Sequence, residues 1–201
     1  MYMRPSTVAR DAAHVREILE RYSFGVMVGG SGDGLFATHL PFLYDADRGE
    51  HGTLVAHLAR ANAHVQQLER GEPQLVIFSG PHGYVSPSWY VRRDTAPTWN
   101  YIAVHCYGVP VITPEPLRAI QRLVDVAEAN RPNPWRVAEL SEAERQRLLA
   151  RVVAFEIPLT RIEAKFKLSQ GELPENTAAA IEVLDREGDP ELVRWMREYA
   201  R

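Results

Sequence analysis

Two polar residues interrupt an apolar stretch at positions 37–41, which read ATHLP. Thr38 and His39 need hydrogen-bond partners wherever a strand buries them. Pro41 withholds a backbone donor, which places this part of the predicted strand at a sheet edge or at a bulge. The free backbone groups of such an edge suit a planar heteroaromatic ligand, which would lie along Thr38, His39 and Leu40. The alternative is that His39 is a core histidine whose hydrogen bonds are satisfied within the protein.

A second segment, HLARAN at 57–62, carries groups that suit a phosphate. Arg60 lies at the start of a predicted helix, where a guanidinium and free backbone N–H groups together can bind an anion. Asn62 offers a further donor, and His57 ends the strand that precedes them. The alternative is an ordinary surface arginine, because single arginines at helix starts are common.

Aromatic residues are dense between positions 84 and 107. Their rings offer stacking faces next to positive charge, which suits a flavin, a nucleotide or single-stranded nucleic acid. Dimer interfaces are enriched in the same residue types, and the two interpretations are compatible. The rings are those of Tyr84, Trp89, Tyr90, Trp99, Tyr101 and Tyr107, interleaved with Ser86, Ser88, Arg92, Arg93 and Asn100.

The segment KFKLSQ at 165–170 ends the last predicted strand. The two-residue period of a strand puts Lys165, Lys167 and Ser169 on one face, where two ammonium groups and a hydroxyl can neutralise an anion. Gln170 follows directly. The alternative is a solvated face of an edge strand that lysine protects from aggregation.

Nucleophilic and metal chemistry has weaker support. Cys106 lies in an apolar, β-rich run, so we expect a buried and inert thiol. His39, His57 and His105 all fall on predicted strands, but carboxylates and further ligands at metal-binding spacings do not accompany them. We therefore assign no metal ligand and no catalytic residue, and the sequence leaves open whether the protein is an enzyme.

The elements that must position these segments are mostly antiparallel strands with helices inserted between them. Ser6 or Thr7 is predicted to cap the first helix, and an SGDG turn at 31–34 to join the first two strands. Predicted strands cover 24–30, 35–43, 53–58, 74–79 (with a continuation at 83–88), 99–112, 153–159 and 162–168. Predicted helices cover 7–22, 60–69, the segment after Pro114, the segment capped by Ser141, 174–187 and 190–201, and residues 89–97 form a loop.

This pattern predicts an α+β fold, mainly β and barrel-like, with peripheral helices and a C-terminal helical tail. We expect one domain at 1–170 and a helical extension at 171–201 that packs on the barrel or on a partner subunit. The chain has 201 residues, 45% of them hydrophobic, and a net charge of −3. One cysteine excludes a disulfide framework, and no run approaches the roughly 20 apolar residues of a membrane span, so we expect a cytoplasmic protein.

In this order, the segments resemble the PaiB-like family of FMN-binding negative transcriptional regulators. The segments that carry the resemblance cover nearly the whole chain and include ATHLP, HLARAN, IFSGPHGYVSPSWY at 77–90, PTWNYIAVHCYG at 97–108 and FEIPLTRIEAKFKLSQ at 155–170. The family commonly continues KLSQ with Asn and Arg, where this chain has Gly171 and Glu172. Its members are FMN-binding split barrels, typically homodimers that hold the flavin at the subunit interface.

The resemblance implies a role for twelve residues of this chain. Thr38, His39 and Leu40 would lie along the isoalloxazine edge, and His57, Arg60 and Asn62 would approach the ribityl phosphate. Trp99, Asn100 and Tyr101 would lie near the interface, and Lys167, Ser169 and Gln170 would close the pocket.

The resemblance also implies a function, a flavin-binding regulator of gene expression that acts as a homodimer. Direct DNA binding has weak support, because no basic recognition helix is visible and the sequence pI is near 6.2. One alternative is an FMN-dependent oxidoreductase acting on a small molecule, in which residues 84–101 would form the substrate wall. A weaker alternative is a haem-binding split barrel with a histidine as the iron ligand.

Overall fold

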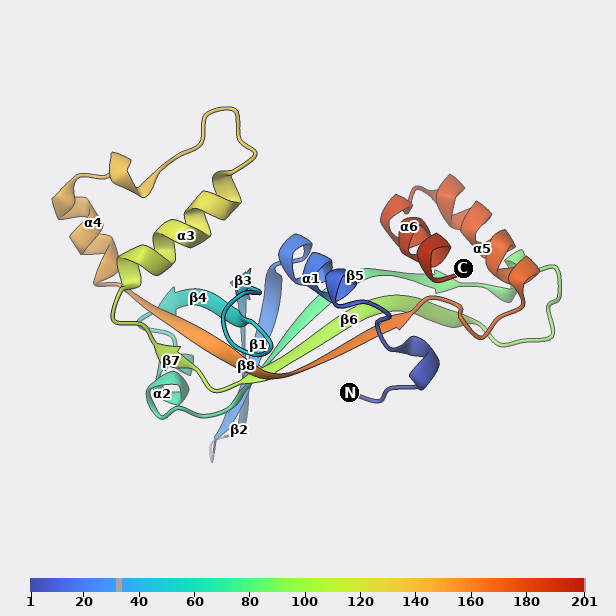
Figure 1. Cartoon of the computed structure of the whole chain (residues 1–201), viewed down its shortest axis with the longest axis horizontal. Helices are drawn as coiled ribbons and strands as arrows, with labels where there is room; N and C mark the ends of the chain where they lie inside the picture. The colour runs from blue at the N-terminus through green and yellow to red at the C-terminus, as the bar shows by residue number, and fades with distance from the viewer. Residues whose placement is uncertain (32–33, 201) are drawn as a thin grey trace. The chain divides into compact units, whose positions relative to one another are not determined.

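A computed structural model describes residues 1–31 and 34–200 of the chain (Figure 1). Its described strands form one eight-stranded, mostly antiparallel sheet in the order β2-β1-β5-β6-β8-β4-β3, with β7 paired to β8. They are β1 (Phe24–Ser31), β2 (Gly34–Pro41), β3 (Leu43–Asp45), β4 (Thr53–Ala59), β5 (Gln74–Val85), β6 (Thr98–Gly108), β7 (Val111–Ile112) and β8 (Val152–Lys167). The expected fold class, α+β with mainly antiparallel strands, is confirmed, and the sheet is not closed.

Six α-helices accompany the sheet within the described ranges. They are α1 (Ala12–Arg21), α2 (His64–Glu69), α3 (Pro116–Glu128), α4 (Glu142–Leu149), α5 (Pro174–Glu187) and α6 (Pro190–Tyr199). The two C-terminal helices were expected at nearly these bounds. Gly188 separates them in the left-handed conformation that favours glycine, with φ at 86°.

The start of α1 differs from the prediction. The helix begins at Ala12, where the Asp11 carboxylate accepts a hydrogen bond from the Ala13 amide at 2.8 Å, so Asp11 replaces the expected cap. Before it, Pro5–Thr7 form a 3-10 helix, and Val8 is extended in an isolated antiparallel bridge with Lys165. A long-range backbone pairing therefore overrides the local helical pattern.

Several predicted strand boundaries also change. The break expected between 74–79 and 83–88 is absent, because β5 runs without interruption from Gln74 to Val85. The segments expected at 153–159 and 162–168 form one continuous strand, β8. Pro158 does not interrupt the pairing of β8 with β4, because it lies at the end of that ladder, opposite Thr53. The run expected at 99–112 instead ends at Gly108, where an added Cβ would collide with the Pro158 carbonyl, and resumes as β7.

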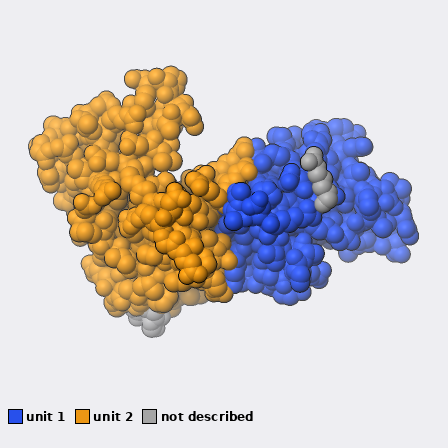
Figure 2. All heavy atoms as spheres, viewed as in Figure 1, with its two compact units in different colours: residues 1–15, 79–104, 163–201 blue, residues 16–78, 105–162 orange. Residues whose placement is uncertain are grey.

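The chain divides into two compact units (Figure 2). Unit 1 comprises residues 1–15, 79–104 and 163–201, and unit 2 comprises residues 16–78 and 105–162. The predicted hairpin of β1 and β2 lies in unit 2 with Val26 opposite His39. Gly32 and Asp33 of its predicted turn lie outside the described residues.

Unit 1 has an aromatic core that fixes the C-terminal helices. The Phe166 ring on β8 stacks on Tyr199 of α6 with centroids 5.1 Å apart, and Trp195 meets Phe166 edge-on at 5.3 Å. Trp195 and Phe166 are almost fully buried.

Candidate functional site

A hydrogen-bond network in unit 2 fixes the Thr38 side chain. His64, fully buried at the start of α2, contacts Thr38 Oγ1 through Nδ1 at 3.0 Å and Gln74 Oε1 through Nε2 at 2.8 Å. Gln74 Nε2 donates to the Glu72 carbonyl, so Gln74 Oε1 must accept the proton of His64 Nε2. His64 Nδ1 is then bare and accepts the Thr38 hydroxyl proton. Thr38 therefore presents only an acceptor lone pair to a ligand.

His39 does not have the role of a core histidine. Its side chain is exposed on β2 and stacks on Phe24 with centroids 6.1 Å apart. The buried, hydrogen-bonded histidine of this region is His64, which the sequence analysis missed. The expectation of a sheet edge is confirmed, because β2 ends the strand order.

Asn62 joins the same network. Its Oδ1 accepts from the His64 amide at 2.9 Å, and its Nδ2 donates to Thr38 Oγ1 at 3.4 Å. His57 on β4 is half-buried, and its Nδ1 atom has no hydrogen-bond partner. Burial lowers the pKa of His57 below its usual value, so the ring is neutral near pH 7.

Arg60 was predicted to lie at the start of a helix, and this prediction is wrong. The residue lies directly after β4. Helix α2 begins only at His64, after a turn and a bend at residues 60–63. The Arg60 guanidinium donates through Nε to the Ala150 carbonyl at 3.0 Å and through one Nη atom to the Val152 carbonyl at 3.1 Å. These two bonds orient the exposed group and leave its other Nη atom available.

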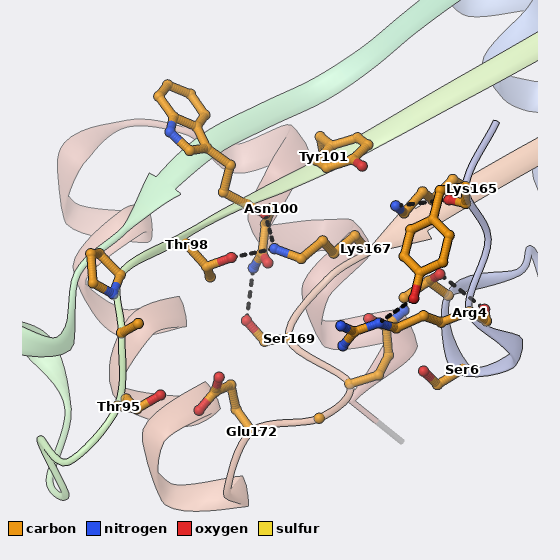
Figure 3. A pocket seen from close by; sticks show the side chains of 17 residues that line it. Arg4, Ser6, Thr95, Thr98, Asn100, Tyr101, Lys165, Lys167, Ser169 and Glu172 are labelled. Atoms are coloured by element: carbon orange, nitrogen blue, oxygen red, sulfur yellow. Dashed lines mark hydrogen bonds between the residues drawn. The ribbon is translucent and has the colours of Figure 1, made fainter.

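The other predicted site residues gather in unit 1. A pocket of about 580 Å³ is lined by all six of them, Trp99, Asn100, Tyr101, Lys167, Ser169 and Gln170 (Figure 3). Tyr2, Arg4 and Lys165 line it as well, and no spacing in the sequence connects the N-terminal pair to the end of β8. Lys165 is 8% exposed and forms a bridge with Val8, so it does not lie on a solvated strand face, and Lys167 is half-buried.

Asn100 is the most buried polar group of this pocket. Its side chain is fully buried, and its Nδ2 donates to Ser169 Oγ at 2.8 Å. Its Oδ1 has no partner, and an unsatisfied buried acceptor costs free energy unless a ligand supplies a donor. Ser169 adopts φ of 69°, a left-handed conformation that is rare outside glycine and is often found at functional sites.

The charge of the pocket is positive. Arg4, Lys165 and Lys167 line it, and none of them forms an ion pair with a carboxylate of the described residues. Lys167 Nζ instead donates to Thr98 Oγ1 and, at 2.5 Å, to the Trp99 carbonyl. Burial lowers the pKa of Lys167, and the charges of Lys165 and Arg4 lower it further.

The aromatic stretch does not form one cluster. Tyr84 meets Trp89 and Trp99 edge-on within unit 1, with centroids 6.5 Å and 6.1 Å apart, whereas Tyr107 belongs to unit 2. There its ring lies 3.8 Å from the guanidinium carbon of Arg161. Trp99 is 54% exposed and remains available for stacking.

Cys106 has the inert character expected of it. Its side chain is fully buried on β6, and burial raises the pKa of the thiol to about 12. Across residues 1–31 and 34–200, no group of three or more His, Cys, Asp or Glu side chains is arranged to hold a metal ion. The described helices include none with the length and apolar character needed to cross a membrane.

Comparison with known proteins then identifies the family. Residues 1–161 match the family model described as “Putative FMN-binding domain”. The chain belongs to this FMN-binding family. The resemblance drawn from the sequence motifs and the expectation of a flavin cofactor are confirmed at the family level.

Individual relatives agree. The chain is 32% identical over 192 residues to the protease synthase and sporulation protein PAI 2 of Bacillus subtilis, covering 94% of this chain and 92% of the relative. Among solved structures, it is similar to the FAD and haem binding protein of Mycobacterium smegmatis, with a TM-score of 0.62, 16% identity and coverage of 80% and 73%. The flavocytochrome Anf3 of Azotobacter vinelandii has a TM-score of 0.58 at 14% identity, with coverage of 82% and 72%. These structures support the fold.

The residues present fit a flavin mononucleotide. Thr38 offers an acceptor for a ring N–H, and Arg60 offers an oriented guanidinium with a free Nη atom for a phosphate. The unpartnered acceptor of Asn100 and the exposed ring of Trp99 add a polar and a stacking contact. The first pair lies in unit 2 and the second in unit 1.

Proposed function

We propose that this protein is an FMN-binding homodimer that acts as a negative regulator of gene expression. Each flavin is bound at the interface between two copies of the chain. One observation carries the proposal: the predicted binding residues fall into two sets, and each set contains a buried polar atom without a partner, His57 Nδ1 and Asn100 Oδ1. A ligand that uses both sets explains both atoms.

Each set has a distinct task in this proposal. In unit 2, Thr38 accepts a hydrogen bond from the N–H edge of the isoalloxazine, and Arg60 and Asn62 approach the phosphate. In unit 1, Trp99 and Tyr101 supply ring contacts, while Asn100, Lys167, Ser169 and Gln170 close the pocket around the flavin. His39 and Leu40 complete the ring contacts along β2.

The regulatory output rests on the family resemblance and on the relative from Bacillus subtilis, whose name connects it with protease synthesis and sporulation. A net charge of −3 disfavours affinity for DNA through charge alone. Regulation through a protein partner, or through a metabolic effect of the flavin, suits this charge better. A chain with one cysteine suits the reducing cytoplasm, where we place it.

An FMN-dependent oxidoreductase is the second candidate, and the positively charged pocket of unit 1 favours it. A bound flavin supplies hydride and electron transfer, and the chain supplies orientation and electrostatics. In this version Lys165 and Lys167 position an anionic substrate, while Trp99 and Tyr101 exclude water from it.

The first experiment is an absorption spectrum of the purified protein, followed by titration with FMN and riboflavin. We expect a flavin spectrum and a preference for FMN. Arg60→Ala should weaken FMN binding at least tenfold and change riboflavin binding little, because one charge-assisted hydrogen bond contributes about 1.5–3 kcal/mol. Equal losses for both ligands would exclude the phosphate role of Arg60.

The same sample separates the alternatives. A Soret band would replace the flavin proposal with haem binding. Bleaching of the flavin band by NAD(P)H would favour the oxidoreductase. A gel shift that persists at physiological salt would establish direct DNA binding, and a regulator that acts through a partner predicts none.

A further inference from the structure

The unit 1 pocket contains a concentration of positive charge, of which only Lys167 belongs to the predicted flavin set. The chain has 21 arginines but only two lysines, Lys165 and Lys167, and both line this pocket. Figure 3 shows them on β8 with Arg4 beside them from the N-terminal segment. Nearly all cationic side chains of the protein are arginines. Both lysines, whose ammonium groups are compact and strongly hydrated, lie at this one pocket.

The three cations lack the acidic partners that are common elsewhere in the chain. Arg48 pairs with Glu156 at 2.6 Å and Arg122 with Asp45 at 2.7 Å, whereas the described residues supply no ion-pair partner to Arg4, Lys165 or Lys167. Neutral groups hold them instead: Lys165 Nζ donates to the Tyr2 carbonyl at 3.1 Å. Glu172 is the one carboxylate among the lining residues.

Burial makes this arrangement costly without a counter-ion. Lys165 is only 8% exposed, and its ammonium lies 5.3 Å from the centre of the Tyr101 ring and 5.5 Å from that of Tyr2. Charges in such surroundings are stable when paired. Repulsion also disfavours the charged form of Lys167, because the charges of Lys165 and Arg4 both lower its pKa. An anion in the pocket would relieve both penalties.

We propose that this pocket binds a small aromatic anion, a ring that carries a carboxylate or a phosphate, as a substrate or effector distinct from the flavin. Lys165, Lys167 and Arg4 neutralise its charge, and the exposed Trp99 ring stacks on it. The inference deepens the second candidate function by naming the chemical class of its substrate, and it rests on that proposed function.

The small number of lysines makes a direct test practical. Protein labelled with [ε-¹³C]lysine should give two lysine signals, which are recorded during titration with phenyl phosphate, benzoate and the neutral benzyl alcohol. We expect saturable shifts of both signals with either anion, a rise in the pKa of Lys167 on binding, and no saturation with benzyl alcohol. Inorganic phosphate should bind more weakly than phenyl phosphate, because it lacks the ring. The relative affinities of phenyl phosphate and benzoate identify the preferred anion.

Variants separate this site from the flavin site. Lys165→Met and Arg4→Met should each weaken anion binding at least tenfold and leave FMN affinity unchanged, because neither residue belongs to the predicted flavin set. Arg118→Met, which removes an exposed arginine of α3 in unit 2, should change neither. All titrations are run on the full chain with and without FMN, so a failure of FMN binding is seen separately.

Three results would overturn the proposal. The first is an absence of saturable lysine shifts with both anions at millimolar concentration. The second is equal binding of benzyl alcohol, or of inorganic phosphate and phenyl phosphate, because the pocket would then recognise only one of the two features. The third is competition of the anion with FMN together with a loss of FMN but not riboflavin affinity in Lys165→Met, which would assign the pocket to the flavin's own phosphate.

Discussion

The buried His64 determines what the Thr38 hydroxyl offers to a ligand. A threonine hydroxyl ordinarily both donates and accepts, but here its proton is held by His64 Nδ1. A hydroxyl that can only accept discriminates strongly between ligands with and without a hydrogen-bond donor. A ligand without a donor leaves the polar atoms of both partners unsatisfied. The hydrogen-bonding character of Thr38 is thus set by two residues behind it, His64 and Gln74.

The same histidine makes the stability of the protein sensitive to acid. Burial lowers the pKa of His64, and also that of His57, below the ordinary value of 6.5. Below that value the unfolded chain binds protons that the folded chain resists, so stability is full above pH 6.5 and is lost as the pH falls from 6.5 to the folded pKa. Urea unfolding should show a loss of up to about 1.4 kcal/mol per pH unit for each histidine.

The control for this prediction is His39, an exposed histidine on β2. His64→Gln should reduce the slope of stability against pH between 6.5 and 5, while His39→Gln, at an exposed position, should keep it. Equal slopes in the wild type and His64→Gln would show that His64 does not contribute.

Cys106 gives a second prediction for a single side chain. Its burial and raised pKa keep the thiolate population negligible, so thiol reagents should not react with the folded protein at pH 8. Ellman's reagent should release one equivalent only after denaturant is added. Rapid reaction of the native protein would show that β6 opens locally.

Gly188 lies between α5 and α6, and its contribution to the stability of the protein can be measured by substitution. Gly188 ends α5 with φ of 86°, which an alanine adopts only with strain. Gly188→Ala should therefore destabilise the protein by about 1 kcal/mol in urea unfolding. Gly171→Ala is the matched control, because an added Cβ there meets no atom within 4 Å and φ is not positive, so it should change stability little.

The elements that the sequence predicted well are those with local signals. The alternation of apolar residues along 152–167 and the Gly188–Asp189 break between the last helices depend on neighbours in the chain. The start of α1 depends instead on the bridge between Val8 and Lys165, which no local pattern reveals. The expected helices and strands are therefore present. Their ends differ from the prediction where pairing with a distant strand replaces the locally favoured conformation.

The candidate site follows the same division. Motif spacing predicted candidate residues on β2, at the end of β4 and at the end of β8, because polar residues stand out within apolar strands. It missed His64, whose burial depends on Gln74 and Thr38, and it missed Tyr2 and Arg4. These residues reach the site through contacts between segments far apart in the chain, which composition and periodicity do not encode.

On the scale of the whole molecule, the central question is whether one copy of the chain can bind FMN. The predicted residues of unit 2, such as Arg60, and those of unit 1, such as Asn100, belong to different compact bodies. If two copies form each site, a twofold dimer has two equivalent sites, and each takes one set from each copy. A defect in either set then abolishes both sites of a homodimer.

Mixing two defective chains decides the matter. Arg60→Ala and Asn100→Ala should each bind FMN poorly, but a heterodimer of the two has one site with both defects and one site with neither. Co-expression should therefore restore tight FMN binding at about a quarter of all sites, since about half of the dimers are mixed and each has one intact site. Titration of the co-expressed mixture against each homodimer measures this fraction. A site within one copy predicts no recovery, because every chain carries a defect, and that result would remove the shared-flavin proposal.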